Sequence, residues 1–264
     1  MTDAVGRSAK ELPHRTLVTL GVVVLAVVLA VTAYSGPAAR WIVALAILLA
    51  EGVLAWGWTR LVGLPSRRGT TIVVATSAVL LTGSVVLPAD GYAMRWTPAA
   101  LAFCVTCAFV HQLLRQDGRP RVVASLSGSM LALAILCSGV AWIALPGLRL
   151  GPPVMASVAL GLAASAGAEW TCLRTRHGRW AMPVTVLVGG LVCLAVGLLL
   201  GLGWAGALLA GVVATLVGAC VRAILAPLPQ LADQRVQLVS AAASLLAPGV
   251  PVYLIADLLV TGAR

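Results

Sequence analysis

Long runs of apolar residues follow one another along almost the whole chain, and this succession constrains the fold more than any other feature. A helix needs about 20 predominantly apolar residues to cross the hydrocarbon core of a bilayer. Nine such runs with short loops use nearly all of the 264 residues and leave no room for a separate soluble domain. The predicted spans are Thr16–Tyr34, Trp41–Trp58, Thr70–Leu87, Thr97–Leu114, Val122–Leu145, Val154–Leu173, Met182–Leu202, Trp204–Ile224 and Val236–Val260.

The composition points to the same fold class. Hydrophobic residues make up 61% of the chain and charged residues 10%, with a mean hydropathy of +1.03. Soluble domains carry roughly a quarter charged residues. A soluble enzyme, a disordered chain and a disulfide scaffold are therefore excluded. We predict an all-α, polytopic transmembrane helix bundle, with an N-terminal tail over residues 1–15 and a single integral membrane domain over residues 16–264.

The basic residues alternate along the chain in step with the predicted spans. Net charge is +10, and 14 of the 18 Lys and Arg lie on the side of the N-terminal tail. Cytoplasmic segments of membrane proteins carry such an excess, and they face anionic lipid. The pattern predicts a multi-pass protein of the cytoplasmic (inner) membrane with its N-terminus inside, in contact with membrane lipid and not with nucleic acid. The 14 residues are Arg7, Lys10, Arg15, Arg60, Arg67, Arg68, Arg115, Arg119, Arg121, Arg174, Arg176, Arg179, Arg222 and Arg235.

Three carboxylates fall within predicted spans, where charged groups are costly and mark functional sites. Counted from the span ends, Glu51 lies about 10 Å and Glu169 about 7–8 Å from the inner interface. Arg222 ends a span on the same side. We expect a Glu51–Glu169–Arg222 cluster, serving either as a substrate or ion site or only to stabilise the bundle. Asp257, near the outer end of the last span, is a weaker candidate.

Cys104, Cys107 and His111 share one face of a predicted helix. They could bind a metal with further ligands from other helices, although ordinary packing explains the same spacing. These three residues form a weak candidate for a metal site, and apart from it we predict no cofactor.

Glycines and prolines mark two further features of the last three spans. Small residues let helices approach closely in lipid, so the Gly-rich spans predict either packing within the chain or a homodimer. The last span contains Pro248-Gly249-Val250-Pro251 and loses two backbone donors. It is a packed kink, a broken helix lining a cavity, or a re-entrant segment that leaves the C-terminus inside. The glycines are Gly197, Gly201, Gly206, Gly211 and Gly218.

The order of several local features resembles the phosphatidate cytidylyltransferase (CDP-diacylglycerol synthase) family. The chain lacks the acidic residues with which that family would hold metal ions, and no Lys follows Lys10. The resemblance therefore implies either a phospholipid head-group enzyme using Mg or a relative that has lost the chemistry. The matching features are Arg15, Glu51-Gly52 with the following basic loop, Gly167-Ala168-Glu169-Trp170 with His177-Gly178-Arg179, Asp233-Gln234-Arg235, and Pro251-Val252-Tyr253.

No complete catalytic motif is present in the sequence. We therefore expect a membrane protein that acts through lipid or partner-protein contacts, with Arg174, Arg176 and Arg179 meeting lipid head groups. A cytidylyltransferase-like enzyme, or its inactive relative, is the alternative. A small-solute transporter that uses the intramembrane carboxylates is a further one.

Overall fold

The computed structural model describes residues 16–88, 94–115, 121–175 and 180–261, and within these ranges the chain is all-α, with no strand. Eight of its helical segments are long and apolar enough to cross a membrane, and a shorter apolar helix precedes them. The predicted tail over residues 1–15 lies outside the described ranges. The helices are α2 (Thr16–Thr32), α3 (Ala39–Leu61), α4 (Arg67–Val86), α5 (Thr97–Leu114), α6 (Val122–Gly139), α7 (Ala141–Ala144), α8 (Gly151–Arg174), α9 (Ala181–Leu199), α10 (Trp204–Leu225), α11 (Gln234–Leu246) and α12 (Gly249–Thr261), with short 3₁₀ turns η2 (Gly36–Ala38), η3 (Leu145–Gly147) and η5 (Pro229–Ala232).

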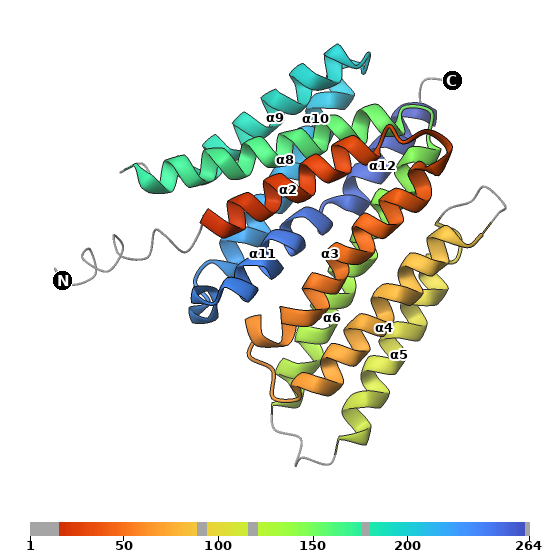
Figure 1. Cartoon of the computed structure of the whole chain (residues 1–264), viewed down its shortest axis with the longest axis vertical. Helices are drawn as coiled ribbons and strands as arrows, with labels where there is room; N and C mark the ends of the chain where they lie inside the picture. Colours follow the sequence, from red (N-terminus) through yellow and green to blue (C-terminus); the bar gives the residue numbers. More distant parts are fainter. Residues whose placement is uncertain (1–15, 89–93, 116–120, 176–179, 262–264) are drawn as a thin grey trace.

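Successive helices run in opposite directions across the molecule (Figure 1). One side of the bundle, at the left and bottom of the view, holds the start of α2 and the ends of α3, α5, α8 and α10. We call it the arginine-rich side. The described arginines at these ends and in the adjoining loops are Arg60, Arg67, Arg68, Arg115, Arg121, Arg174, Arg222 and Arg235. The opposite side carries Arg40, Arg95 and Arg149.

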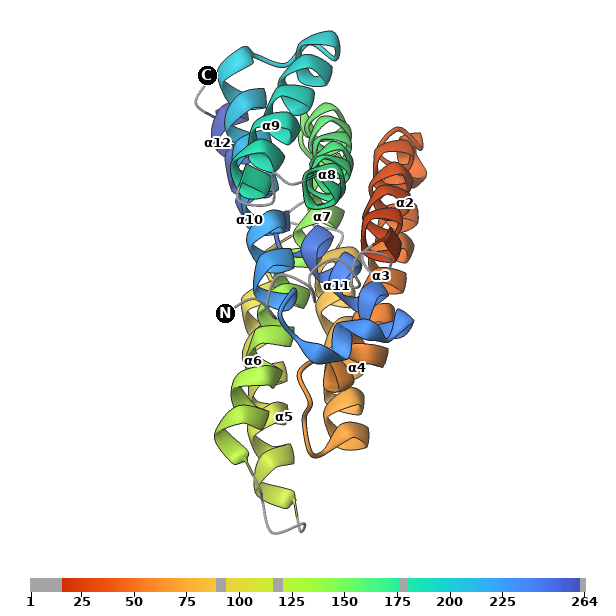
Figure 2. The ribbon, with the colours of Figure 1, turned by 90° about the vertical axis from the view of Figure 1, so that its left-hand side faces the viewer.

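Helix α11 lies at the centre of the fold, and α12 continues from it to the periphery. Helices α8, α9 and α10 pack on one another with α2 alongside, and α3 to α6 form a second group. Helix α11 touches α2, α3, α6 and α10, and α12 touches α6, α7, α8 and α10. Figures 1 and 2 show α11 between the two groups. Its residues 239–246 are all buried, so the two groups share one core.

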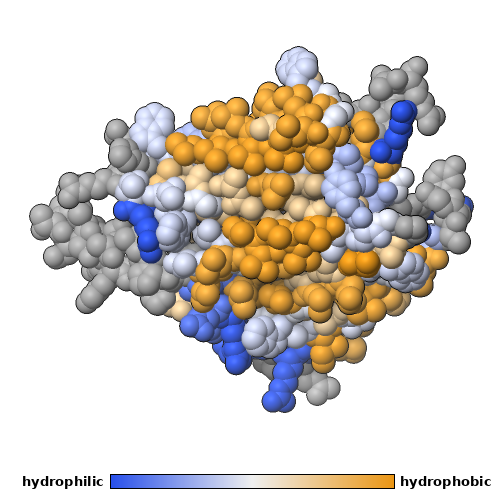
Figure 3. Space-filling view, turned by 45° about the horizontal axis from the view of Figure 1, so that its top comes forward, coloured by the Kyte–Doolittle hydropathy of each residue, from blue (hydrophilic) through white to orange (hydrophobic). Residues whose placement is uncertain are grey.

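The outer surface is apolar, as lipid contact requires. Leucine, valine and phenylalanine side chains such as Leu45, Val79, Phe103 and Leu187 are exposed on several helices. Figure 3 shows apolar side chains covering the middle of one face, with hydrophilic side chains toward its edges. An exposed apolar surface of this extent is unusual in a soluble monomer.

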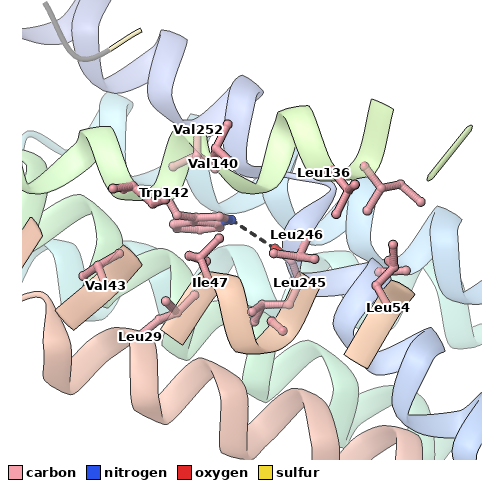
Figure 4. Close-up of a cluster of buried hydrophobic side chains, with 14 of the residues drawn as sticks. Leu29, Val43, Ile47, Leu54, Leu136, Val140, Trp142, Leu245, Leu246 and Val252 are labelled. Atoms are coloured by element: carbon pink, nitrogen blue, oxygen red, sulfur yellow. Dashed lines mark hydrogen bonds between the residues drawn. The ribbon is translucent and has the colours of Figure 1, made fainter. Parts of the chain in front are cut away.

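The last predicted span is broken between α11 and α12, and side chains of α6 and α7 bind the freed backbone groups. Without an N–H at Pro251, the carbonyl of Ala247 has no helical donor, and the Ser138 hydroxyl donates to it at 2.5 Å. The same hydroxyl accepts from the Val250 N–H at 3.0 Å. Trp142 Nε1 donates to the Leu245 carbonyl at 3.1 Å (Figure 4).

These contacts favour the packed kink over the other interpretations of the break. Helix α12 continues across the molecule away from the arginine-rich side (Figure 1), unlike a re-entrant segment. An apolar pocket of about 220 Å³ between α6 and α10 nevertheless reaches Ser138 and Ala247, so the break does border a cavity.

Three glycines of α9 and α10 lie against residues of neighbouring helices in the same chain. A Cβ added at Gly211 would lie 2.4 Å from the Cβ of Cys193, and one at Gly197 would lie 2.7 Å from that of Ala207. At Gly218 the nearest atom would be the Ser244 carbonyl oxygen, at 3.0 Å. These three glycines therefore pack helices of one chain together, and a homodimer through the same helices stays a prediction.

Tryptophans at the predicted span ends differ in environment. Amphipathic rings prefer the membrane interface, and Trp41, Trp96, Trp180 and Trp204 are exposed as that preference suggests. Trp58 is instead fully buried, and its Nε1 donates to the Gly128 carbonyl at 2.8 Å. This hydrogen bond joins α3 to α6. Trp58 is not at the end of its helix, because α3 continues to Leu61.

Candidate functional site

The three residues of the predicted cluster occupy two separate places. Glu169 and Arg222 form an ion pair, whereas Glu51 contacts neither of them. The two glutamates, which the sequence places at similar depths, lie at different distances from the ends of their helices. Because α3 runs from Ala39 to Leu61, Glu51 lies near its midpoint, about 15 Å from its end at 1.5 Å per residue. Glu169 lies five residues before Arg174, the last residue of α8.

The ion pair joins α8 to α10 near the arginine-rich side. Arg222 Nε donates to Glu169 Oε2 at 2.5 Å, and Nη2 donates to the Ser165 hydroxyl at 3.2 Å. The Arg222 side chain is 4% exposed and that of Glu169 is 21% exposed. Arg222 Nη1 is buried with no hydrogen-bond partner in the described part of the chain. A guanidinium group stays charged in proteins, and the Glu169 side chain is the acidic partner that the fold places against it.

A small pocket lies beside this ion pair. Val18, Trp170, Ala226 and Ser240 are among the residues that line it, together with the pair itself. Its volume of about 30 Å³ has room for a water molecule or two and not for a lipid head group. A ligand of phosphate size therefore does not fit inside this pocket.

Arg174 is stacked on Trp170, one of the residues that line this pocket. Its guanidinium lies 3.9 Å from the ring centroid of Trp170, whose Nε1 donates to the Thr16 hydroxyl at 3.3 Å. On the same side, the Arg235 guanidinium lies 4.8 Å from the Trp56 ring. Guanidinium groups held over aromatic faces keep their N–H donors free for phosphate or carboxylate oxygens.

Glu51 lies where α3 meets α4, α6 and the end of α11. Its side chain is fully buried, and Oε2 accepts from the Thr82 hydroxyl at 3.0 Å. Oε1 has no hydrogen-bond partner among the described residues. A Cβ at Gly139 would lie 3.4 Å from Oε1 and 2.7 Å from Leu246. The carboxyl group is therefore packed against the helix break.

The cysteine and histidine stripe packs against α4 and brings no metal ligands together. His111 lies on Gly69, where a Cβ would meet its ring at 2.1 Å, and its Nε2 is 3.5 Å from the Ser66 hydroxyl. Cys104 is buried beside Ser77, and Cys107 is half-buried. Within the described ranges no three His, Cys, Asp or Glu side chains approach closely enough to hold a metal ion. The contacts of His111 with Gly69 and of Cys104 with Ser77 are packing contacts, and the metal site at this stripe stays a prediction.

Among the other predicted site residues that the structure describes, Asp257 lies on a different helix from both places. Asp257 is half-buried on α12, one turn after Tyr253, with which it interacts electrostatically. Arg176 and Arg179 lie outside the described residues. The sequence analysis did not identify four side chains that form hydrogen bonds at these places. Ser165 binds Arg222 and Thr82 binds Glu51, whereas Ser138 and Trp142 bind the backbone at the break. The two prolines predicted that some backbone carbonyls would need other donors, but they did not show which side chains would supply them.

Comparison with protein-family models, with curated proteins and with solved structures finds no match to this chain. Its class follows from the fold itself. Eight long apolar helical segments, an apolar outer surface and charged groups paired or hydrogen-bonded inside the bundle define a multi-pass membrane protein. The resemblance to phosphatidate cytidylyltransferases stays a prediction.

Proposed function

We propose that the chain is an integral protein of the cytoplasmic membrane that binds anionic phospholipid head groups on its arginine-rich side. In this proposal α2 and the eight longer segments all cross the bilayer, with the N-terminus inside. The observation that carries it is the stacking of Arg174 on Trp170, a residue that lines the pocket beside the Glu169–Arg222 pair. It supplies a guanidinium at head-group depth, where tryptophan rings prefer to lie.

The internal ion pair supports a role for Arg174 rather than Arg222 as the lipid ligand. Arg222 is neutralised by Glu169 and is buried, so its charge is not available to a head group. Among the described residues no carboxylate pairs with Arg174, which is the last residue of α8. Basic residues at a membrane surface each contribute about 1 kcal/mol to binding of anionic lipid.

The orientation predicts which loops an impermeant reagent can reach. Gly203 and Gln230 flank α10 at its opposite ends and are exposed, and a Cβ at Gly203 meets no other atom. In a chain whose native cysteines are replaced by serine, we expect an impermeant maleimide to label Gly203→Cys in intact cells. Gln230→Cys should react only after the membrane is opened. The reverse labelling pattern would show that the protein has the opposite orientation in the membrane. Labelling of both cysteines in intact cells would show that α10 does not cross the membrane.

Neutralising Arg174 should weaken the retention of anionic phospholipid. We expect Arg174→Gln to lower the affinity of the purified protein for phosphatidylglycerol about fivefold, as the loss of about 1 kcal/mol implies. Binding of phosphatidylcholine should not change. Native mass spectrometry of the protein with defined lipid mixtures measures both affinities.

Arg95→Gln provides the matched control for that experiment. Arg95 lies 5.6 Å from the ring of Trp96, in a similar stacked pair on the opposite side of the bundle. Its replacement should leave affinity for phosphatidylglycerol unchanged if the inner side holds the lipid. Equal losses in both variants, or no preference for anionic lipid in the unmodified protein, would contradict the proposal.

The same preparation distinguishes lipid binding from the enzymatic alternative. Phosphatidic acid, CTP and Mg would be supplied, and CDP-diacylglycerol measured. Turnover that is lost in Glu169→Gln would replace the present proposal with phospholipid synthesis. Absence of turnover from folded protein would leave lipid contact in place.

A further inference from the structure

The buried carboxyl group of Glu51 is the polar group that the lipid-binding proposal does not use. It lies near the middle of α3, with both oxygens out of reach of solvent and without a basic side chain in contact. Transferring an unpaired carboxylate into such a medium costs far more than protonating it. The group therefore carries a proton when the fold is as described.

The chemistry around Glu51 selects the proton over a metal cation. A metal ion of the size of calcium or magnesium requires about six oxygen ligands or more. The oxygens that meet here are those of Glu51 and the hydroxyl of Thr82. Two of the carbonyls freed at the helix break are already bound, that of Ala247 by Ser138 and that of Leu245 by Trp142. A proton needs a single oxygen, and Oε1 is the one without a partner.

The surroundings also contain a rearrangement that would respond to ionisation. Gly139 lies against Oε1, and the preceding residue, Ser138, both donates to and accepts from the broken segment. Ionisation of Glu51 would place a negative charge beside Gly139, the residue that follows Ser138 and its two hydrogen bonds to the broken segment. Helix α6 is itself irregular here, since the Ile143 N–H bonds to the Val140 carbonyl three residues earlier at 3.0 Å.

Titratable groups that face Glu51 are few. Among the described residues, Cys137 on α6 interacts with it electrostatically, and Cys104 on α5 interacts with Cys137. Thr82 on α4 and Leu246 on α11 bring no charge. Deprotonation of Glu51 thus creates a charge that the fold in this arrangement does not balance.

We propose that Glu51 is a proton-binding site at the crossing of α6 and the α11–α12 break, and that it exchanges its proton with water when the break rearranges. In the exchange the O–H bond of the carboxyl group breaks, its electron pair stays on Oε1 and the proton passes to a water molecule. The return step reverses this. The inference is independent of lipid binding and gives the transporter alternative a specific residue.

Infrared difference spectroscopy of the full chain in lipid vesicles tests this site directly. We expect a carbonyl band of a protonated carboxylic acid at neutral pH that disappears as the pH is raised. The band should be absent in Glu51→Gln and unchanged in Glu11→Gln. Glu11, Glu51 and Glu169 are the glutamates of the chain, so carbon-13 glutamate assigns the band to this residue type.

Two results would overturn the proposal. Absence of the band at neutral pH would mean that Glu51 is ionised. A band that persists unchanged to alkaline pH would mean that it is a fixed hydrogen-bonding group that does not exchange. If Glu51→Gln does not fold, Glu51→Asp replaces it, because the band would then lose its sensitivity to labelled glutamate.

Discussion

Replacing Glu169 by Met is expected to destabilise the folded protein by about 3–5 kcal/mol. The change removes the carboxylate that balances Arg222, whose side chain is 4% exposed and whose guanidinium cannot lose its proton under ordinary conditions. Ser165 would remain as a neutral acceptor for one of its N–H groups. Titration with denaturing detergent, followed by loss of helical signal, measures the difference from the unmodified protein.

The double variant Glu169→Met/Arg222→Met separates charge from packing. Replacing both members of a buried ion pair by apolar residues is often neutral or stabilising. We therefore expect it to recover most of the lost stability, and Glu169→Gln, which keeps an acceptor oxygen, to fall between. A double variant as unstable as Glu169→Met would show that the pair matters through its shape rather than its charge.

A single methyl group at Gly249 should have a comparable effect on assembly. The Cβ of an alanine there would lie 2.0 Å from the carbonyl oxygen of Ser138 and 3.0 Å from Trp142. Both obstacles belong to the α6–α7 segment, and the nearer one is backbone, which cannot turn away as a side chain can. Overpacking in cores costs about 1–3 kcal/mol and occasionally more, and we expect Gly249→Ala to lie at or above the upper end.

Gly52→Ala and Gly167→Ala are the matched controls. Each lies within a long helix, and an added Cβ would meet no atom within 4 Å. Both should be neutral or slightly stabilising, because alanine favours a helix over glycine by about 1 kcal/mol. Size-exclusion profiles and thermal midpoints of the three variants provide the comparison. A Gly249→Ala protein that matches the controls would mean that α11–α12 can shift at the break without loss.

Helix positions followed from the sequence because membrane spans have a strong signal. The expected Thr97–Leu114 agrees with α5 at both ends, and Trp204–Ile224 differs from α10 by one residue. Hydropathy cannot show where an apolar helix continues past a tryptophan. The end of α3 was therefore placed at Trp58 instead of Leu61, and the depth of Glu51 was misjudged with it.

The part of the candidate site that could be predicted is the ion pair, because both of its residues lie near helix ends on the same side of the bundle. Glu169 and Arg222 both lie a short distance from the arginine-rich ends of their helices, and the sequence shows this directly. Which face each helix turns to its neighbours is set by packing between distant segments. For that reason Thr82, 31 residues from Glu51, could not be identified as its partner. Likewise Trp142 lies 103 residues from the carbonyl that it binds.

The contacts of α11 with helices of both groups have a consequence for how the protein is made. Chains are synthesised from the N-terminus, and early segments can fold while later ones are still in the ribosome. Helix α2 contacts both α3 and α8, so one link between the two groups can form before α11 has been synthesised. The contacts of α11 with α3 and α6 can form only when that helix arrives, and we therefore expect the surroundings of Glu51 and Ser138 to close at the last stage of assembly.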